Sequence, residues 1–327
     1  MDSMLSRHDD GLWSAVAGDG RPLLRLFAVG LGLAGAFAWF VSAVGETLPH
    51  ELQYLGMSAA DLHALAGGRV ADFMTHDRVA FGGTLLAISV LYLWLITVPL
   101  AGREPWAWAL IVLSGAFGFA SFLAYLGYGY LDLWHAVATT GLLPIFVVGV
   151  VMTRPRGGRS SVPPSAGRAW PTWRTVEGAG RALLLLTGIG MIVAGLTILT
   201  LGTVVVFVPQ DLVYIGFDRA ALDAMNPRLV PLIAHDRSGF GGGLLTIGLL
   251  VIGCVRFAGW SRSLWQALLV SGGIGFGAAI GIHGLVGYLD ASHVGPAVAG
   301  GLVFALGMIL TRPRGGSVAA APSGRQR

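Results

Sequence analysis

Two stretches of this chain carry the same histidine, aspartate and arginine in the same order. HDRVAFGGTLL at 76–86 matches HDRSGFGGGLL at 235–245 in eight of eleven positions, and YLDLWH at 130–135 matches YLDASH at 288–293. Upstream, PHELQYLG at 49–56 matches PQDLVYIG at 209–216. The polar residues shared by the copies are Glu51 and Asp211, His76 and His235, Asp77 and Asp236, Arg78 and Arg237, Asp132 and Asp290, and His135 and His293.

These residue types suit a transition-metal site. Asp132 and His135 are three residues apart, so in a helix they lie on one face. Two histidines with one or two carboxylates are typical ligands of Zn²⁺, Fe or Mn²⁺. We therefore predict one constellation per copy. Its metal-ligand candidates are His76, Asp132 and His135 in the first copy and His235, Asp290 and His293 in the second; its catalytic carboxylate candidates are Asp77, Glu51, Asp236 and Asp211.

A structural interpretation of the same residues competes with the metal site. Aspartate is a preferred residue at a helix start, where it caps free N–H groups and complements the helix dipole. Arg78 can pair with Asp132, and Arg237 with Asp290, so that each arginine pins one helix to another. The histidines then only form hydrogen bonds where helices meet.

His283 stands apart from the repeated blocks. It lies inside an apolar stretch, and the first copy has Tyr125 or Leu126 at the corresponding place. Ionisable residues within membrane helices are functional candidates by default. We therefore keep His283 as a weaker candidate for cofactor binding, beside the alternative of a hydrogen-bonded packing residue.

The segments that must position these residues are strongly apolar. Of 327 residues, 54% are hydrophobic and only 12% are charged. About 20 apolar residues are needed to cross the hydrocarbon core of a bilayer. One stretch, 22–45, contains Arg25 as its single charge, and seven contain none: 79–100, 105–131, 133–153, 182–210, 238–255, 263–289 and 291–311. The sequence predicts an all-α integral membrane protein of about eight transmembrane helices, the first of them uncleaved.

The repeat divides these helices into two tandem units. We expect a tail at 1–21, a four-helix unit at 22–153, a linker at 154–180, a second four-helix unit at 181–312 and a tail at 313–327. Four crossings return the chain to its starting side, so the units are parallel repeats about an axis along the membrane normal.

Arginine distribution sets the predicted orientation. The chain has no lysine, and sixteen of its 21 basic residues fall on the side that eight crossings give to both termini. The positive-inside rule places that side in the cytoplasm. We expect a multi-pass protein of the cell membrane, with both termini cytoplasmic and the His/Asp/Arg blocks at the outer membrane edge.

Composition also excludes several functions. Without lysine there is no Schiff base and no phosphate-binding P-loop lysine, and the single Cys254 excludes disulfides and thiolate metal cages. The basic balance reflects topology, so nucleic acid is not an expected partner. We predict a metal- or cofactor-binding, membrane-embedded enzyme. The alternatives are a transporter of an apolar or lipid-like substrate and a non-catalytic subunit of a membrane complex. The expected partners of the protein are the lipid bilayer and either other membrane proteins or further copies of the chain.

Overall fold

The computed structural model describes residues 18–45, 47–123, 130, 133–155 and 172–313. All regular elements in these ranges are helices. The long helices are α2 (Arg21–Ala43), α5 (Arg69–Thr97), α6 (Pro105–Leu123), α7 (Leu133–Met152), α8 (Val176–Val204), α11 (Leu229–Phe257), α12 (Arg262–Val286) and α13 (Ala291–Leu310). The short ones are α3 (Pro49–Leu55), α4 (Ala59–Ala64), η1 (Leu65–Gly68), α9 (Pro209–Ile215) and α10 (Arg219–Met225).

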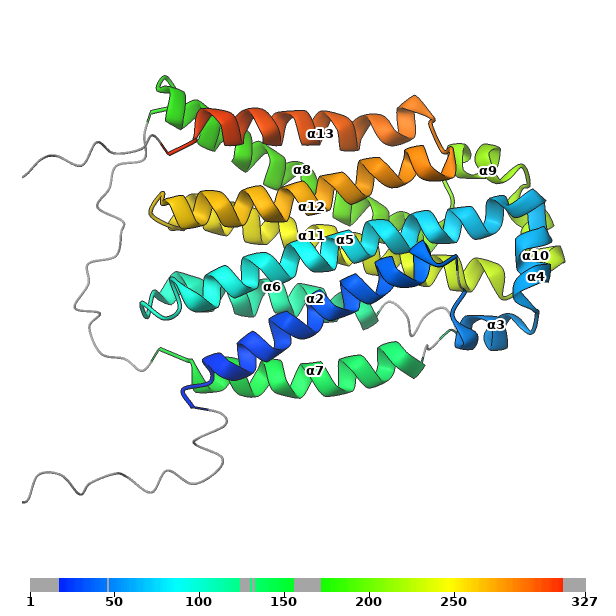
Figure 1. Ribbon diagram of the computed structural model, residues 1–327, viewed down its shortest axis with the longest axis horizontal. Helices are drawn as coiled ribbons and strands as arrows, with labels where there is room; N and C mark the ends of the chain where they lie inside the picture. The colour runs from blue at the N-terminus through cyan, green and yellow to red at the C-terminus, as the bar shows by residue number, and fades with distance from the viewer. Residues whose placement is uncertain (1–17, 46, 124–129, 131–132, 156–171, 314–327) are drawn as a thin grey trace, which may run out of the picture.

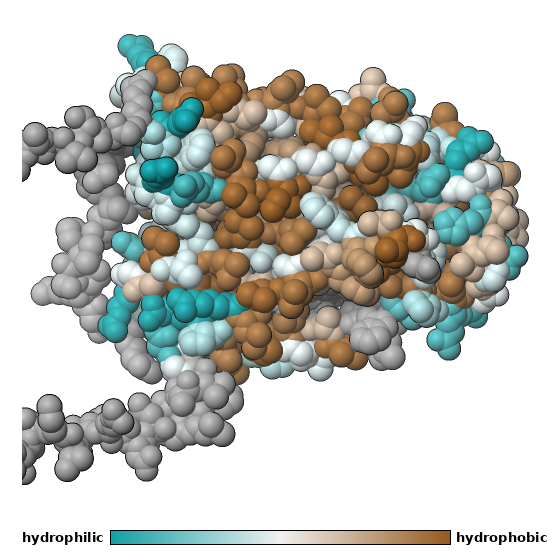
Figure 2. Space-filling view, in the orientation of Figure 1, coloured by the Kyte–Doolittle hydropathy of each residue, from teal (hydrophilic) through white to brown (hydrophobic). Residues whose placement is uncertain are grey.

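Six of the described helices are long and apolar enough to cross a bilayer: α2, α5, α8, α11, α12 and α13. Large apolar side chains on their outer faces are exposed, such as Leu33 at 66% and Leu285 at 84%. Figure 2 shows hydrophobic residues over the long helices and hydrophilic residues gathered toward the two ends. The expectation of an all-helical, multi-pass membrane protein is confirmed. Within the described residues α6 and α7 are apolar but shorter, and eight crossings stay a prediction.

The long helices lie side by side, and the short ones gather at one end of the bundle (Figure 1). α5 and α11 contact each other; α2 packs on α5, and α8 packs on α11. Two helices pack against the other half of the chain: α12 of the second half packs on α5, and α6 of the first half packs on α11. Residues from the two halves are therefore neighbours in the middle of the bundle.

Glycines permit the tight contacts of the two central helices. A Cβ added at Gly195 of α8 would lie 2.7 Å from the carbonyl oxygen of Gly241 in α11. In the first half, a Cβ at Gly35 of α2 would lie 2.5 Å from the carbonyl oxygen of Gly82 in α5. Such close backbone approach is how helices associate in lipid, where hydrophobic exclusion contributes little.

The short helices form a second apolar core over the ends of α5 and α11. It contains Leu55, Leu62, Ile215 and Leu222, packed with Phe73 of α5. Their ends follow from local sequence. Ser58 and Asp218 cap α4 and α10 by accepting a backbone N–H, and α3 and α9 end at glycines in the left-handed conformation, Gly56 (φ 67°) and Gly216 (φ 84°). This core covers the end of the bundle where the repeated polar residues lie.

Candidate metal centre

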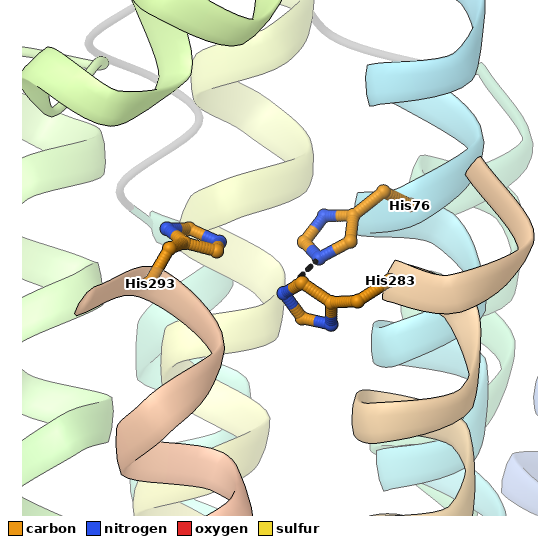
Figure 3. Close-up of side chains that lie close together, drawn as sticks. All are labelled: His76, His283 and His293. Atoms are coloured by element: carbon orange, nitrogen blue, oxygen red, sulfur yellow. Dashed lines mark hydrogen bonds between the residues drawn. The ribbon is translucent and has the colours of Figure 1, made fainter. Parts of the chain in front are cut away.

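Three histidines converge where α5, α12 and α13 meet beneath the short helices. His76 comes from α5, His283 from α12 and His293 from α13 (Figure 3). One ligand atom from each lies within 4.8 Å of those of the other two, close enough to hold a metal ion. His76 and His283 are buried, whereas His293 is partly exposed. We call His76, His283 and His293 the three-histidine cluster.

Hydrogen bonds fix which ring nitrogens of the cluster carry protons. His76 Nδ1 lies 2.9 Å from a carboxylate oxygen of Asp77, and His283 Nδ1 lies 2.6 Å from the carbonyl oxygen of Ala279. Both partners are acceptors, so each Nδ1 donates its hydrogen. In the neutral rings, each Nε2 then presents a lone pair.

These two Nε2 atoms face each other at 3.1 Å. Two lone pairs at that distance repel unless a positive charge, either a metal ion or an additional proton, lies between them. Nitrogens bound at about 2.0–2.1 Å to a tetrahedral Zn²⁺ are about 3.3 Å apart. The observed separation therefore needs only a small adjustment to share one ion, and the third histidine is already adjacent.

A buried ion-pair network lies behind the cluster. Arg237 of α11 places Nε 3.3 Å from Asp77 and Nη1 2.7 Å from Asp211. The Tyr288 hydroxyl donates to Asp211 at 2.8 Å, and His293 Nδ1 lies 3.8 Å from the same carboxylate. We call Asp77, Asp211, Arg237 and Tyr288 the Arg237 network. It orients His76 through Asp77, as outer-shell carboxylates orient metal-binding histidines.

The network carries a net formal charge of −1, from two carboxylates and one guanidinium. The side chains of Arg237, Asp77 and Asp211 are 9%, 4% and 0% exposed, so this charge is poorly screened by water. Neutral histidines beside it do not balance it. A cation at the three-histidine cluster does, which agrees with the facing Nε2 atoms.

Tyrosines close the side of the cluster next to the short helices. Tyr288 stacks on the ring of His293, with centroids 4.3 Å apart, and on Tyr214 of α9 at 4.5 Å. Burial, reinforced by the neighbouring charge of Asp211, raises the pKa of Tyr288. Burial, with a contribution from Asp72, raises the pKa of Tyr214 to about 12. Both phenols therefore stay protonated at neutral pH, and Tyr288 stays a hydrogen-bond donor.

The remaining repeated residues, which come from both copies, form a different arrangement. His235 Nδ1 lies 2.9 Å from Asp236, as His76 does from Asp77. Arg78 Nη2 donates to both carboxylate oxygens of Glu51, at 2.7 and 2.6 Å. Burial is the largest influence on Glu51 and raises its pKa, although Arg78 opposes the shift. Within the described part of the chain, these residues bring no second group of three histidines together.

Both arginines form buried ion pairs. Arg237 does so with partners other than the expected Asp290, whereas the pairing of Arg78 with Asp132 stays a prediction, because Asp132 is not among the described residues. Arg237 binds Asp211 and Asp77, and Arg78 binds Glu51. The exposed Asp290 accepts the backbone N–H groups of Ser292 and His293, so it caps α13 and lies outside the three-histidine cluster. Asp290 is one helical turn from His293, but its carboxylate accepts hydrogen bonds from the backbone of α13 instead. Asp132 lies outside the described residues, as does the side chain of His135.

The sequence pattern groups the ligands within each copy, whereas the structure joins His76 of the first copy to His293 of the second. The cause is the crossing of α12 onto α5, which no spacing within a copy reveals. His283, the weaker candidate, is central to the cluster. Its signal was an ionisable residue inside an apolar stretch.

Comparison with known proteins finds no matching family model, and no curated protein or solved structure is significantly similar to this chain.

Proposed function

We propose that this chain is a membrane-embedded metalloenzyme in which His76, His283 and His293 hold one divalent cation, Zn²⁺, Fe or Mn²⁺. The observation that carries the proposal is the pair of Nε2 lone pairs facing each other at 3.1 Å while both Nδ1 atoms are committed to acceptors. Imidazole ligands suit all three metals. The net charge of the Arg237 network favours a cation at the same place.

Three protein ligands are typical of a catalytic rather than a structural metal site, because the fourth position stays open for water or substrate. A cation held this way supplies Lewis acidity and a bound water of lowered pKa. Asp77 and Ala279 keep the tautomers of His76 and His283, and Tyr288 packs over His293. His293, 19% exposed, gives the cluster its contact with the outside of the fold.

Elemental analysis of the purified protein tests this proposal. Prepared without chelators, the wild-type protein is expected to carry about one transition-metal ion per chain, and removal of the ion by a chelator should lower its thermal unfolding temperature. A ligand that binds only the folded state stabilises it by about 2.7 kcal/mol at 100 times its Kd. A metal-free protein whose unfolding temperature responds to neither chelator nor added Zn²⁺, Fe²⁺ or Mn²⁺ would remove the metalloenzyme proposal.

We also infer eight crossings in two parallel units, with both termini in the cytoplasm of the cell. Support comes from the order of long and short helices, which recurs in residues 21–152 and 176–310, and from corresponding packing pairs such as α2 on α5 and α8 on α11. The arginine distribution supports the orientation. The three-histidine cluster then lies near the outer membrane edge.

Cysteine labelling tests the orientation. With Cys254 replaced, single cysteines at Ser58 and Asp218 are expected to react with an impermeant thiol reagent in intact cells, because α4 and α10 lie at the outer end. A cysteine at Ser160, in the linker, should react only after the cells are opened. Labelling of Ser160 alone in intact cells would invert the topology.

A further inference from the structure

A second feature of the bundle lies on the other side of α5 and α11 from the metal centre. It is a half-open cavity between α2, α5, α6 and α11. Phe27, Phe81, Phe119 and Leu85 form much of its wall. Four glycines of α6 and α11 also line it, namely Gly115, Gly118, Gly239 and Gly243.

The polar groups in the cavity wall are all satisfied by the protein. Tyr92 Oη lies 2.9 Å from Ser114 Oγ, which itself donates to the carbonyl oxygen of Leu110 at 2.6 Å. Ser121 donates to the carbonyl oxygen of Gly118, and Thr246 to that of Gly242. Each hydroxyl hydrogen is therefore used, and the cavity offers no free donor to a polar ligand or to water, which needs two to four polar partners.

The cavity also opens within the apolar length of the bundle. Its rim includes partly exposed side chains of α2, α5 and α6, such as Leu31, Leu85 and Phe119. The first half of α2 packs against α7, from Gly20 against Met152 to Gly30 against Leu142. In Figure 1, α7 and the far end of α2 diverge from there. The opening therefore faces the hydrocarbon region rather than water.

We propose that this cavity binds one hydrocarbon chain of a membrane lipid. Protein interiors are packed as densely as organic crystals, and an unfilled space forfeits the dispersion contacts of its walls. In a bilayer, the surrounding medium that can fill an apolar, donor-free cavity is an acyl chain. This inference does not depend on the metal. Residues of α5 and α11 contribute both to the cavity and to the surroundings of the metal centre, but none of the three histidines lines the cavity.

Photocrosslinking tests the proposal directly. The full chain is reconstituted into vesicles of phosphatidylcholine, a fraction of which carries a diazirine on one acyl chain, and adducts are mapped by mass spectrometry after illumination. The wild-type protein is expected to carry adducts on cavity-lining residues of α2 and α6, including Leu31 and Phe119. Leu31→Trp fills the rim and should remove most of these adducts.

The matched control is Leu33→Trp, the same change on the lipid-facing side of the same helix, where the leucine is 66% exposed. It should leave the cavity adducts at the wild-type level. Leu85→Trp, from α5, should repeat the loss if Leu31→Trp does not give a monodisperse protein. Adducts only on outward-facing residues, or equal cavity labelling in wild type, Leu31→Trp and Leu85→Trp, would overturn the proposal.

Discussion

Replacing Arg237 by glutamine is expected to lower the free energy of unfolding by about 3–5 kcal/mol, the range for removing one partner of a buried ion pair. Arg237 is the cation between Asp77 and Asp211, at 3.3 and 2.7 Å. Its loss leaves two carboxylates buried without their cation. Thermal unfolding in detergent, read as a fall in the unfolding temperature, measures the effect.

Two further variants separate this cause from a general effect of losing an arginine. Arg219 pairs with Asp223 at 3.9 Å with both side chains nearly half exposed, so Arg219→Gln should change stability by about 1 kcal/mol or less. The double variant Arg237→Gln/Asp211→Asn should recover part of the loss, because one uncompensated charge is removed with its partner. An Arg237→Gln protein as stable as wild type would show that the buried charges are balanced in some other way.

His76→Ala is expected to abolish metal binding, whereas His235→Ala is expected to preserve it. The two histidines are a matched pair. Each lies near the start of a central helix, His76 in α5 and His235 in α11. Each places its Nδ1 2.9 Å from a carboxylate oxygen of the aspartate that follows it in the sequence. They differ in their neighbours: His76 faces His283 and His293, and His235 packs against Tyr130 with ring centroids 4.9 Å apart.

Metal content and the stabilisation by added metal are measured for both variants alongside size-exclusion profiles. His76→Ala should elute as a monodisperse protein with less than a tenth of the wild-type metal, because loss of an outer-shell partner alone already weakens metal affinity about 10–100-fold. Equal metal loss in both variants, or a greater loss in His235→Ala, would place the ion elsewhere.

Much of the fold follows from local sequence, because six of the long helices are apolar over enough residues to cross a bilayer. The capping residues Ser58 and Asp218 also follow, since their helices begin with a residue whose side chain accepts a backbone N–H. The chain carries its polar candidates twice, so the repeat identified most of the residues in the site. Helix boundaries and residue types are local properties, and local patterns predict them.

The grouping of those residues does not follow from the sequence. Arg237 and Asp290 are in the same copy, and pairing them was the simplest expectation, yet Arg237 reaches across to Asp77 of the other copy. Asp290 satisfies the N–H groups of its own helix instead. The partners are chosen by the packing of α5 against α11 and α12, which depends on contacts between glycine-rich faces far apart in sequence. The same packing brings His283 into the three-histidine cluster. His283 has no counterpart in the first copy, so the repeat does not point to it.

X-ray absorption at the edge of the metal found in the wild-type protein tests the central claim most directly. If His76, His283 and His293 hold the ion, the spectrum should show the multiple scattering of about three imidazoles, with nitrogens at about 2.0–2.1 Å for Zn²⁺. The same spectrum from His235→Ala should be unchanged. A coordination shell without imidazole, made of oxygen ligands alone, would contradict the assignment of the three-histidine cluster as the metal centre.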